Sequence, residues 1–241
     1  MNDTAEKCWI CGDFADTREH RIKRTDIRQV LGEATQNKPL FVHDDGKRNR
    51  RVQSTNAKVL RGKKDLCAKC NNEFTQPHDK SWERLSFYLY ENWPGIIKSG
   101  AFRVSKAFPK GARKGMRDVH LFFAKSLGCA AKEGNVSINM DKLAHGIKTN
   151  KPIDNFWLSI GETPEPEKDN TIGRTDLLVT NEKKTGNAVA LSMVFTFGGV
   201  SVLVEFSISN DLVLGTKESW HPKCGTKLIT LSKFNDDKKI V

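Results

Sequence analysis

Two short motifs decide the fold, Cys8-Trp-Ile-Cys11 and Cys67-Ala-Lys-Cys70, and both have the spacing Cys-x-x-Cys. Two such pairs can supply the four thiolates of one tetrahedral zinc ion. A zinc ion held by four thiolates has no open position for a substrate, so we expect a structural Zn²⁺ that fastens two distant loops. The two remaining cysteines, Cys129 and Cys224, stand alone in the sequence, and we expect them to be free thiols.

The composition is that of a folded protein with an excess of positive charge. Of the 241 residues, 37% are hydrophobic and 29% are charged, and the net charge is +11. This length suits one large domain or two small ones, and the charge favours a polyanionic partner such as nucleic acid. No apolar run approaches the roughly 20 residues of a membrane span, and the first residues do not resemble a secretory signal. We therefore expect a soluble, cytoplasmic protein with no membrane partner.

Basic residues gather in two runs. The first, Gly46–Leu66, lies between the two cysteine motifs, and the second, Arg103–Arg117, contains no acidic residue. Such runs are often only solvated surface, but the position of the first one favours contacts with phosphate. The residues that we predict to contact nucleic acid are Arg48, Arg50, Arg51, Arg61, Lys63, Lys64, Arg113, Lys114 and Arg117.

Three residues next to the cysteine motifs have the chemistry of phosphodiester hydrolysis. Glu19 and His20 lie between the two motifs, and Asn71 directly follows Cys70. A histidine can take a proton from water near neutral pH, and carboxylate and amide oxygens are hard ligands that suit Mg²⁺ or Mn²⁺. Adjacent side chains in an extended strand face opposite ways, so Glu19 and His20 can share a site only where the strand is bent.

This pattern resembles the HNH, or His-Me finger (ββα-metal), endonucleases, in particular the subset clasped by a four-cysteine zinc ion. Phage recombination endonucleases that resolve branched DNA have a similar arrangement. The resemblance covers residues 8 to about 80. It implies that His20 is the general base and that Asn71 helps to bind a catalytic Mg²⁺ or Mn²⁺. Glu19 occupies the place where the family usually has an aspartate that binds this ion.

The resemblance also has gaps that neighbouring residues could fill. Asn71 stands where the last histidine of a His-Asn-His set is usual, and Asn56 is the nearest candidate for the middle asparagine. Four polar residues just downstream could complete the site or hold a phosphate: Asn72, Gln76, His78 and Asp79. Among the remaining histidines we expect a surface position for His43 and a packed, structural one for His120, while His145 and His221 have no partner pattern.

The sequence pattern predicts short elements before residue 80 and a strand-rich region after residue 150. The first expected elements are an extended segment Arg18–Arg24, a helix Asp26–Leu31 ending at Gly32, and a loop or weak hairpin within Gln36–Asn56. Next come a helix Pro77–Asn92 ended by Trp93-Pro94-Gly95, a basic loop or hairpin Arg103–Gly115, and a helix Met116–Ala131. The expected strands are Phe156–Ile160, Asp176–Thr180, Ala188–Phe197 and Val200–Ile208, with a surface loop Gly161–Asn170 and a hairpin turn at Gly198-Gly199.

Together these features predict an α+β protein in two parts. Residues 1–80 would form a zinc-bound HNH-like nuclease module. Residues 81–241 would form an α+β accessory or recognition domain with an antiparallel sheet, helical in 81–150 and strand-rich in 151–241. We expect a metal-dependent endonuclease that acts on double-stranded DNA and leaves 5′-phosphate and 3′-hydroxyl ends, as the resemblance implies. The alternative is a zinc knuckle that binds nucleic acid without catalysis. Pairing of two copies, and a trigger ligand or protein partner for the second part, remain open.

Overall fold

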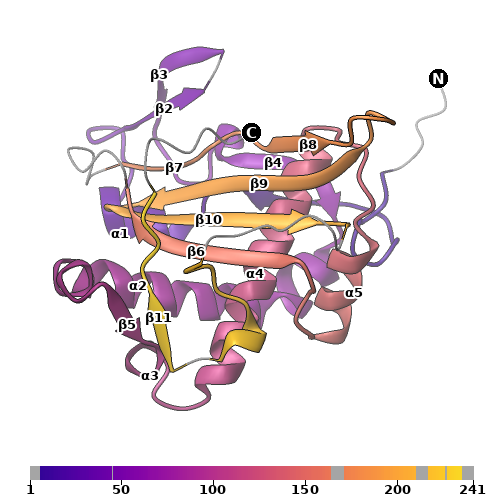
Figure 1. Ribbon diagram of the computed structural model, residues 1–241. Coiled ribbons are helices and arrows are strands. Elements are labelled where there is room, and N and C mark those ends of the chain that lie inside the picture. Colours follow the sequence, from indigo (N-terminus) through magenta and orange to yellow (C-terminus); the bar gives the residue numbers. More distant parts are fainter. Residues whose placement is uncertain (1–5, 45, 164–170, 210–216, 226, 235–241) are drawn as a thin grey trace.

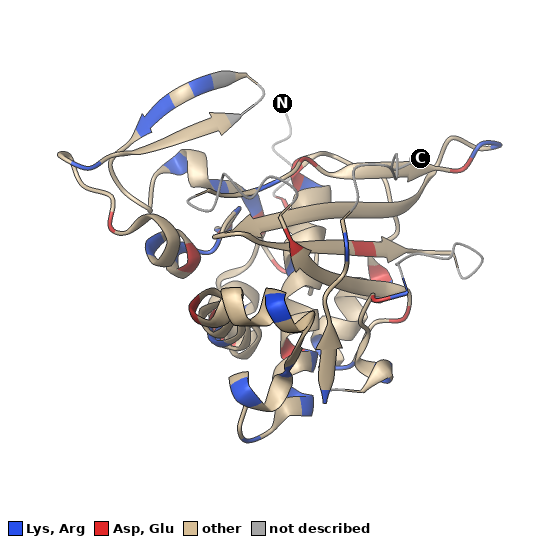
Figure 2. Ribbon diagram, turned by 60° about the vertical axis from the view of Figure 1, so that its left-hand side comes forward, with Lys and Arg blue, Asp and Glu red and all other residues tan. Residues whose placement is uncertain are grey.

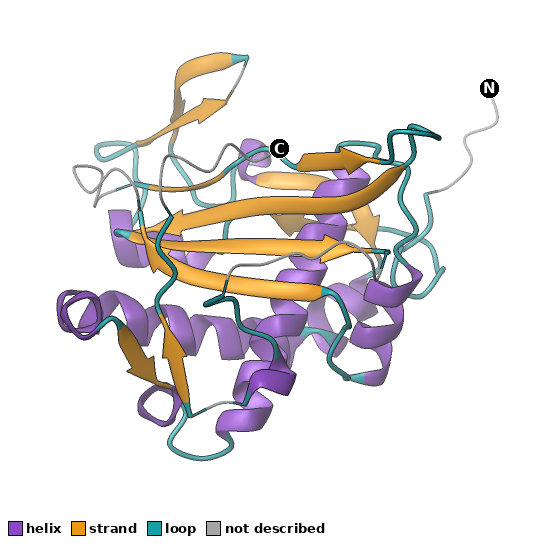
Figure 3. Ribbon diagram, in the orientation of Figure 1, coloured by secondary structure: helices purple, strands orange, loops and turns teal. Residues whose placement is uncertain are grey.

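The computed structural model describes residues 6–44, 46–163, 171–209, 217–225 and 227–234. Helices and antiparallel strands are mixed along the chain, as predicted (Figure 3). The largest sheet has five strands, and its three longest follow the order β6 (Phe156–Glu162), β10 (Val200–Ser207) and β9 (Ala188–Phe197). β7 (Ile172–Arg174) and β8 (Leu178–Asn181) both pair with β9.

The sheet forms where the sequence alternates between residues that become buried and residues that stay partly exposed. In β9 and β10 most alternate side chains are buried, and these strands are joined by a tight turn at Gly198-Gly199. Both glycines have positive φ, 50° and 83°, which is the backbone that two-residue hairpin turns require. The predicted hairpin is therefore confirmed.

One face of this sheet packs on two long helices, α2 (Gln76–Ser99) and α4 (Ala112–Glu133) (Figure 1). The buried apolar side chains form one continuous cluster that runs from Cys8 to Ile229, and a smaller cluster surrounds Ile27. The helix α5 (Asp141–Thr149) packs on α4, and the short elements β5 (Ala101–Arg103), α3 (Val104–Ala107) and β11 (Leu228–Thr230) lie at the far end of α2. A short 3₁₀ turn, Pro222–Cys224, contacts α4.

The first 75 residues supply a second layer of small elements. β1 (Thr17–His20) pairs antiparallel with β4 (Arg61–Leu66), and a π-helical turn, Lys69–Phe74, leads into α2. Between β1 and β4 lie α1 (Arg24–Leu31), the hairpin of β2 (Leu40–Asp44) and β3 (Lys47–Val52), and a 3₁₀ turn, Lys58–Leu60. The helix ending at Gly32 and the hairpin alternative are thus confirmed. The extended segment expected at Arg18–Arg24 is confirmed only in part, because β1 ends at His20 and Arg24 already begins α1.

The predicted end of the second helix is wrong. α2 begins with Pro77 in its first turn, as expected, but it continues through Pro94 to Ser99 and ends at Gly100, whose φ is 68°. A proline inside a helix removes one backbone hydrogen bond. Trp93 and Ile96 are buried on either side of it, so burial of this stretch outweighs the lost bond.

Two further predictions need correction. The segment Arg103–Gly115 is not a hairpin, because its first residue ends β5 and its last part already belongs to α4. In the loop expected at Gly161–Asn170, the first two residues belong to β6, and residues 164–170 lie outside the described residues. β7 had no counterpart among the predicted strands.

The predicted division at residue 80 falls inside α2, and the residues on both sides of it contribute to the same apolar cluster. Two separately folded parts therefore remain a prediction, and the buried side chains give no sign of a boundary there. Among the described residues, none of the helices combines the length and hydropathy that a membrane span requires.

A buried carboxylate fixes α1 against α2. Asp26 is 4% exposed and accepts hydrogen bonds from Trp82 Nε1 and Ser86 Oγ, each at 2.7 Å. Burial raises the pKa of Asp26 to about 6, although these two hydrogen bonds act to lower it. This pair of bonds holds the chain after β1 in place above α2.

We expect Asp26→Ala to lower the free energy of unfolding by about 2 kcal/mol, because the indole N–H of Trp82 would lose its acceptor in a buried position. Urea unfolding followed by circular dichroism measures this change. Glu33→Ala is the control: it removes an exposed ion pair with Arg28 and should change the stability by less than about 0.5 kcal/mol. Equal effects of the two substitutions would contradict the role given to Asp26.

Candidate functional site

The four predicted zinc ligands come together. The Sγ atoms of Cys8, Cys11, Cys67 and Cys70 all lie within 4.8 Å of one another and could hold a metal ion such as zinc. A tetrahedron with Zn–S bonds of about 2.3 Å has S···S edges of about 3.8 Å. The separation of 3.6 Å between Cys11 Sγ and Cys67 Sγ fits such an edge.

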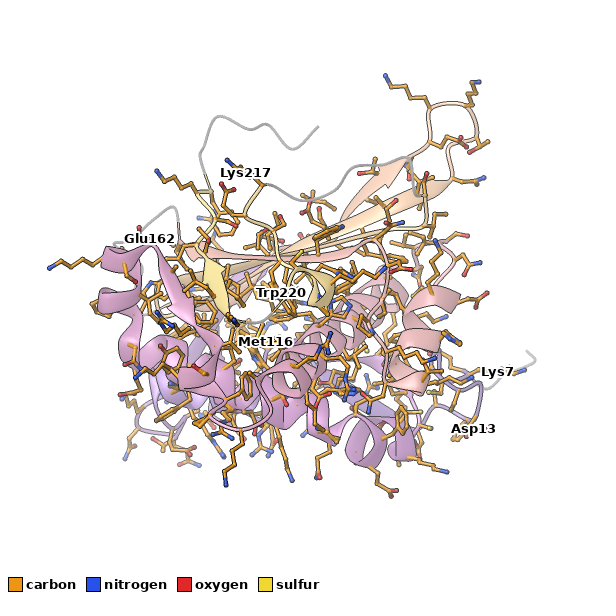
Figure 4. The ribbon with its side chains drawn as sticks, turned by 60° about the horizontal axis from the view of Figure 1, so that its bottom comes forward. Lys7, Asp13, Met116, Glu162, Lys217 and Trp220 are labelled. Carbon is orange, nitrogen blue, oxygen red and sulfur yellow. The ribbon has the colours of Figure 1, made fainter. Side chains whose placement is uncertain are left out.

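Backbone turns shape this cluster from both sides. Gly12 N donates to Cys8 O at 2.8 Å, and the positive φ of Gly12, 90°, lets the chain reverse after the first pair. In the second pair, Cys70 N points at Cys67 Sγ at 3.4 Å. The first cysteine motif, Cys8–Cys11, lies at one edge of the molecule, where Figure 4 labels the flanking residues Lys7 and Asp13.

The thiols need a cation to ionise together. Burial raises the pKa of Cys11 to about 11 and also raises that of Cys70. The other three cysteines add to the shift of Cys70, whereas for Cys11 the thiols of Cys67 and Cys8 add to the shift and that of Cys70 opposes it. Metal ligation requires thiolates, and a bound cation supplies the positive charge that offsets their repulsion. The chemistry of the donor set therefore suits a thiophilic metal ion.

The side chain of Trp9, inside the first cysteine motif, packs against the core. Its indole lies against Gly128 in α4, so closely that a Cβ added there would come within 2.4 Å of a ring atom. Trp9 N also donates to Asp65 O at 3.2 Å, next to the second cysteine motif. The metal cluster and the central helix are thus in direct contact.

Glu19 points at a lysine that the sequence analysis did not select. Its Oε2 lies 3.2 Å from Lys125 Nζ, and the same ammonium reaches Asp79 Oδ1 at 3.0 Å and Oδ2 at 3.2 Å. The Lys125 side chain is 0% exposed, whereas Glu19 and Asp79 keep 13% and 14% of theirs. The only signal in the sequence is a single lysine within the apolar stretch of α4.

His20 and Glu19 share a cavity despite being adjacent in β1. The pairing of β1 with β4 is irregular between Arg18 and His20, and such irregularities turn a side chain away from its regular direction. Both residues line a cavity of about 20 Å³, together with Trp82 and residues 195–197. A cavity of this size holds about one water molecule. The bend that the sequence analysis required is present.

The surroundings of His20 favour its neutral form. Burial, together with the positive charges of Arg61, Arg24 and Lys23, lowers the pKa of His20 to about 4. Arg61 lies directly opposite His20 in the sheet register, and Arg24 begins α1. His20 is therefore uncharged at neutral pH and stands among cations.

Three buried polar atoms around this histidine have no hydrogen-bond partner among the described residues: His20 Nδ1, Arg24 Nε and Arg61 Nε. Buried polar groups are normally paired, so a cluster of unpaired ones calls for a water or a ligand. Two of the three belong to guanidinium groups, which prefer an anion.

Asn71 lies beside β1 but turns its amide group toward the strand. Its Nδ2 donates to Thr17 Oγ1 at 3.3 Å and to Arg18 O at 3.4 Å. The asparagine thus fixes the strand that carries Glu19 and His20. Among the described residues, only the four cysteines bring three or more His, Cys, Asp or Glu side chains within reach of one ion.

The other predicted supporting residues separate. Asp79 joins Glu19 through Lys125, but Asn72 is exposed in the turn Lys69–Phe74 and Gln76 is exposed at the start of α2. His78 is buried and its Nε2 lies 3.2 Å from Asn150 Oδ1, on the side of α5. Of the four, Asp79 alone shares an ion-paired partner with Glu19.

The predicted nucleic-acid contacts do not form one surface. The hairpin β2–β3, which carries Arg48, Arg50 and Arg51, projects from one end of the molecule, and the start of α4 lies at the other end (Figure 2). There, Lys114 and Arg117 both bind the buried carboxylate of Asp118. This local pairing leaves less charge for a partner than the sequence suggests.

The residues predicted in β4 lie near the catalytic candidates. Arg61 Nη2 donates to Asn56 Oδ1 at 3.2 Å, and Lys63 Nζ donates to Asn135 Oδ1 at 2.8 Å, while Lys64 is exposed. Asn56 therefore positions Arg61.

The expectations for the remaining histidines and cysteines are confirmed where the structure tests them. His43 is exposed, and His120 is fully buried, where its Nε2 accepts a hydrogen bond from Ile153 N at 3.0 Å. Cys129 and Cys224 are both free thiols, the first buried and the second exposed.

The structure also contains a cleft much larger than the cavity beside His20, and no pattern in the sequence predicts it. It has a volume of about 960 Å³ and lies between the hairpin β2–β3, β7 and the end of α4. In its wall, Glu133 binds Arg21 through one oxygen and Arg174 through the other, the latter at 2.7 Å. These residues are far apart in the sequence, so no local pattern indicates the cluster.

Comparisons with protein-family models, with curated proteins and with solved structures gave no match to this chain.

We expect the purified protein to contain about one zinc ion per chain, and Cys67→Ser to lose it and to lower Tm by roughly 10 °C. Residues before and after position 80 share one apolar core, so loss of the zinc ion should destabilise the whole chain and not only its first 80 residues. Elemental analysis and thermal unfolding measure the two effects. Cys224→Ser, at an exposed free thiol, should change neither. A zinc-free Cys67→Ser protein with unchanged Tm would contradict the structural role of the metal.

Proposed function

We propose that this chain is a zinc-clasped phosphodiester hydrolase of the HNH type and that His20 activates the attacking water. The four-cysteine cluster would hold Zn²⁺ and fix the antiparallel pair β1–β4 against α2. Two antiparallel strands followed by a helix are the arrangement that the resemblance to ββα-metal nucleases implies. DNA is the substrate that the resemblance favours.

The observation that carries this proposal is the group of unpaired buried atoms around His20. A phosphate next to Arg24 and Arg61 would accept hydrogen bonds from guanidinium groups whose Nε atoms have no partner within the described part of the chain. The water-sized cavity beside His20 would hold the nucleophile. The cavity is too small for the phosphodiester itself, which would have to bind at its mouth.

The low pKa of His20 suits this arrangement once the substrate is bound. A base with a pKa of about 4 is always neutral at pH 7 but takes up protons weakly. The shift is caused by burial and by three neighbouring cations, and the negative charge of a phosphate would offset those cations. Substrate binding would therefore raise the pKa of His20 toward the range in which it is an effective base.

The predicted Mg²⁺ or Mn²⁺ fits these residues less well. Glu19, its expected first ligand, is ion-paired with Lys125, and the amide nitrogen of Asn71 faces β1. The proposed hydrolysis therefore relies on His20 and the neighbouring arginines and not on a divalent ion. The involvement of Glu19 and Asn71 in binding one remains a prediction.

A second function is favoured by the enclosed position of His20. β7 and β9 contribute to the cavity wall, and the space inside suits water alone. A zinc knuckle that binds nucleic acid without cutting it does not need a cavity large enough for a phosphodiester next to His20. Such a protein would bind through its basic surfaces and would need neither His20 nor a catalytic ion.

We expect nicking of supercoiled plasmid DNA by the zinc-loaded protein, with a loss of about 100-fold or more in His20→Ala, because removal of a general base costs about this factor. Parallel reactions with Mg²⁺, Mn²⁺ or EDTA report separately on the predicted ion. His145→Ala, at an exposed histidine of α5, is the control and should cut like the original chain. Binding of DNA without any cleavage, unaffected by His20→Ala, would favour the binding module.

We further expect the hairpin β2–β3 to contribute more to DNA binding than the start of α4. Replacing Arg48, Arg50 and Arg51 with Ala should lower the slope of log K against log salt by about 2 to 3, since each lost phosphate contact lowers it by about 0.9. Replacing Arg113, Lys114 and Arg117 should lower the slope by about 1 or less, because Asp118 already binds two of these three side chains. Fluorescence anisotropy at several salt concentrations measures both. The reverse order would place the DNA at the α4 end.

A further inference from the structure

Three separate elements converge on the ammonium of Lys125. Glu19 comes from β1, Asp79 from the first turn of α2, and Lys125 from the middle of α4. The ammonium lies 3.0 to 3.2 Å from three carboxylate oxygens. An ammonium has three N–H groups, so these three oxygens can satisfy all of them. Every N–H group of the Lys125 ammonium can therefore donate to a carboxylate oxygen.

The charges of the cluster nearly balance. Glu19 and Asp79 contribute two negative charges and Lys125 contributes one positive charge. Lys23 Nζ lies 3.5 Å from Asp79 Oδ1 and 3.4 Å from Glu83 Oε1, so three carboxylates face two ammonium groups. Lysine is almost never fully buried unless it is paired, and Lys125 is 0% exposed. A divalent ion added to this cluster would leave an excess of positive charge in a place with little solvent.

The spacing of the oxygens also suits an ammonium and not a magnesium ion. Mg²⁺ binds oxygen at about 2.0–2.1 Å, about 1 Å closer than the distances around Lys125 Nζ. To bind both carboxylates, the ion would have to expel the ammonium from between them. The Lys125 side chain is 0% exposed, so expelling its ammonium would require the side chains packed around it to rearrange.

We propose that Lys125 is a built-in cation, whose ammonium binds Glu19, the residue that the sequence predicts as a ligand of Mg²⁺ or Mn²⁺, together with Asp79. It is a positioning residue, because it is fully enclosed and reaches the proposed reaction only through Glu19 and the strand that carries His20. Its place in catalysis rests on the proposed function, but its effect on metal binding does not. The positive charge for the phosphate would come instead from Arg24 and Arg61.

Binding of Mn²⁺ tests this directly, because electron paramagnetic resonance counts free Mn²⁺ in a solution of the zinc-loaded protein. The unsubstituted chain and Glu19→Gln should bind Mn²⁺ equally, since Glu19 is already occupied by Lys125. If the unsubstituted chain binds one Mn²⁺ that Glu19→Gln abolishes, the proposal is overturned. This comparison needs no variant of Lys125.

Removal of the ammonium gives the complementary test. Lys125→Met keeps much of the side-chain volume and leaves two carboxylates facing each other, so it should gain an Mn²⁺ site at least about tenfold tighter than any in the unsubstituted chain. Adding Glu19→Gln to Lys125→Met should remove that site. Lys132→Met, at an exposed lysine of the same helix, is the matched control and should gain nothing.

The outcomes separate this proposal from the proposed function. A folded, zinc-loaded Lys125→Met protein that gains no Mn²⁺ site would overturn the built-in cation, whether or not the chain cuts DNA. The zinc content and Tm of Lys125→Met show whether it folds. If it does not fold, Mn²⁺ binding by the unsubstituted chain and by Glu19→Gln decides whether Lys125 is a built-in cation. If His20→Ala leaves any nicking unchanged while Glu19→Gln leaves Mn²⁺ binding unchanged, the proposed function fails and the built-in cation stands.

Discussion

The contact between Trp9 and Gly128 is the constraint on which the rest of the structure depends. It places an aromatic ring from within the first cysteine motif directly on the central helix α4, at a point where only glycine leaves room. Three of the four cysteines, Cys8, Cys67 and Cys70, belong to the main apolar cluster, as does Leu66. The cysteine cluster, β4 and α4 therefore pack as one unit.

The candidate site follows from this arrangement. β1 is held by β4 on one side and by Asn71 on the other, so its bent end brings His20 and Glu19 to the same cavity. Lys125, in the middle of α4, then binds Glu19 and Asp79. The cations around His20 and the ammonium between the carboxylates belong to different elements, yet both depend on how closely the first 75 residues pack on α4.

Local patterns in the sequence predicted what is local in the structure. The cysteine spacing, the helix that ends at Gly32, the hairpin turn at Gly198-Gly199 and the helix around Met116 are each set by a few neighbouring residues, and all are present. The partners of Glu19 could not be predicted in this way, because Lys125 is more than 100 residues away in the chain. The continuation of α2 through Pro94 was missed for a similar reason. Burial against distant elements, which no local rule includes, outweighs the local cost of the proline.

The course of α2 across residue 80 has a consequence for where the chain can change in length. A segment cut after residue 80 would retain only the first turn of α2 and would expose Leu66 and the face of Trp9 that α4 covers. An insertion within α2 would likewise separate buried side chains that now share one core. The hairpin β2–β3 projects away from that core, so insertions or deletions at its turn would disturb fewer buried contacts.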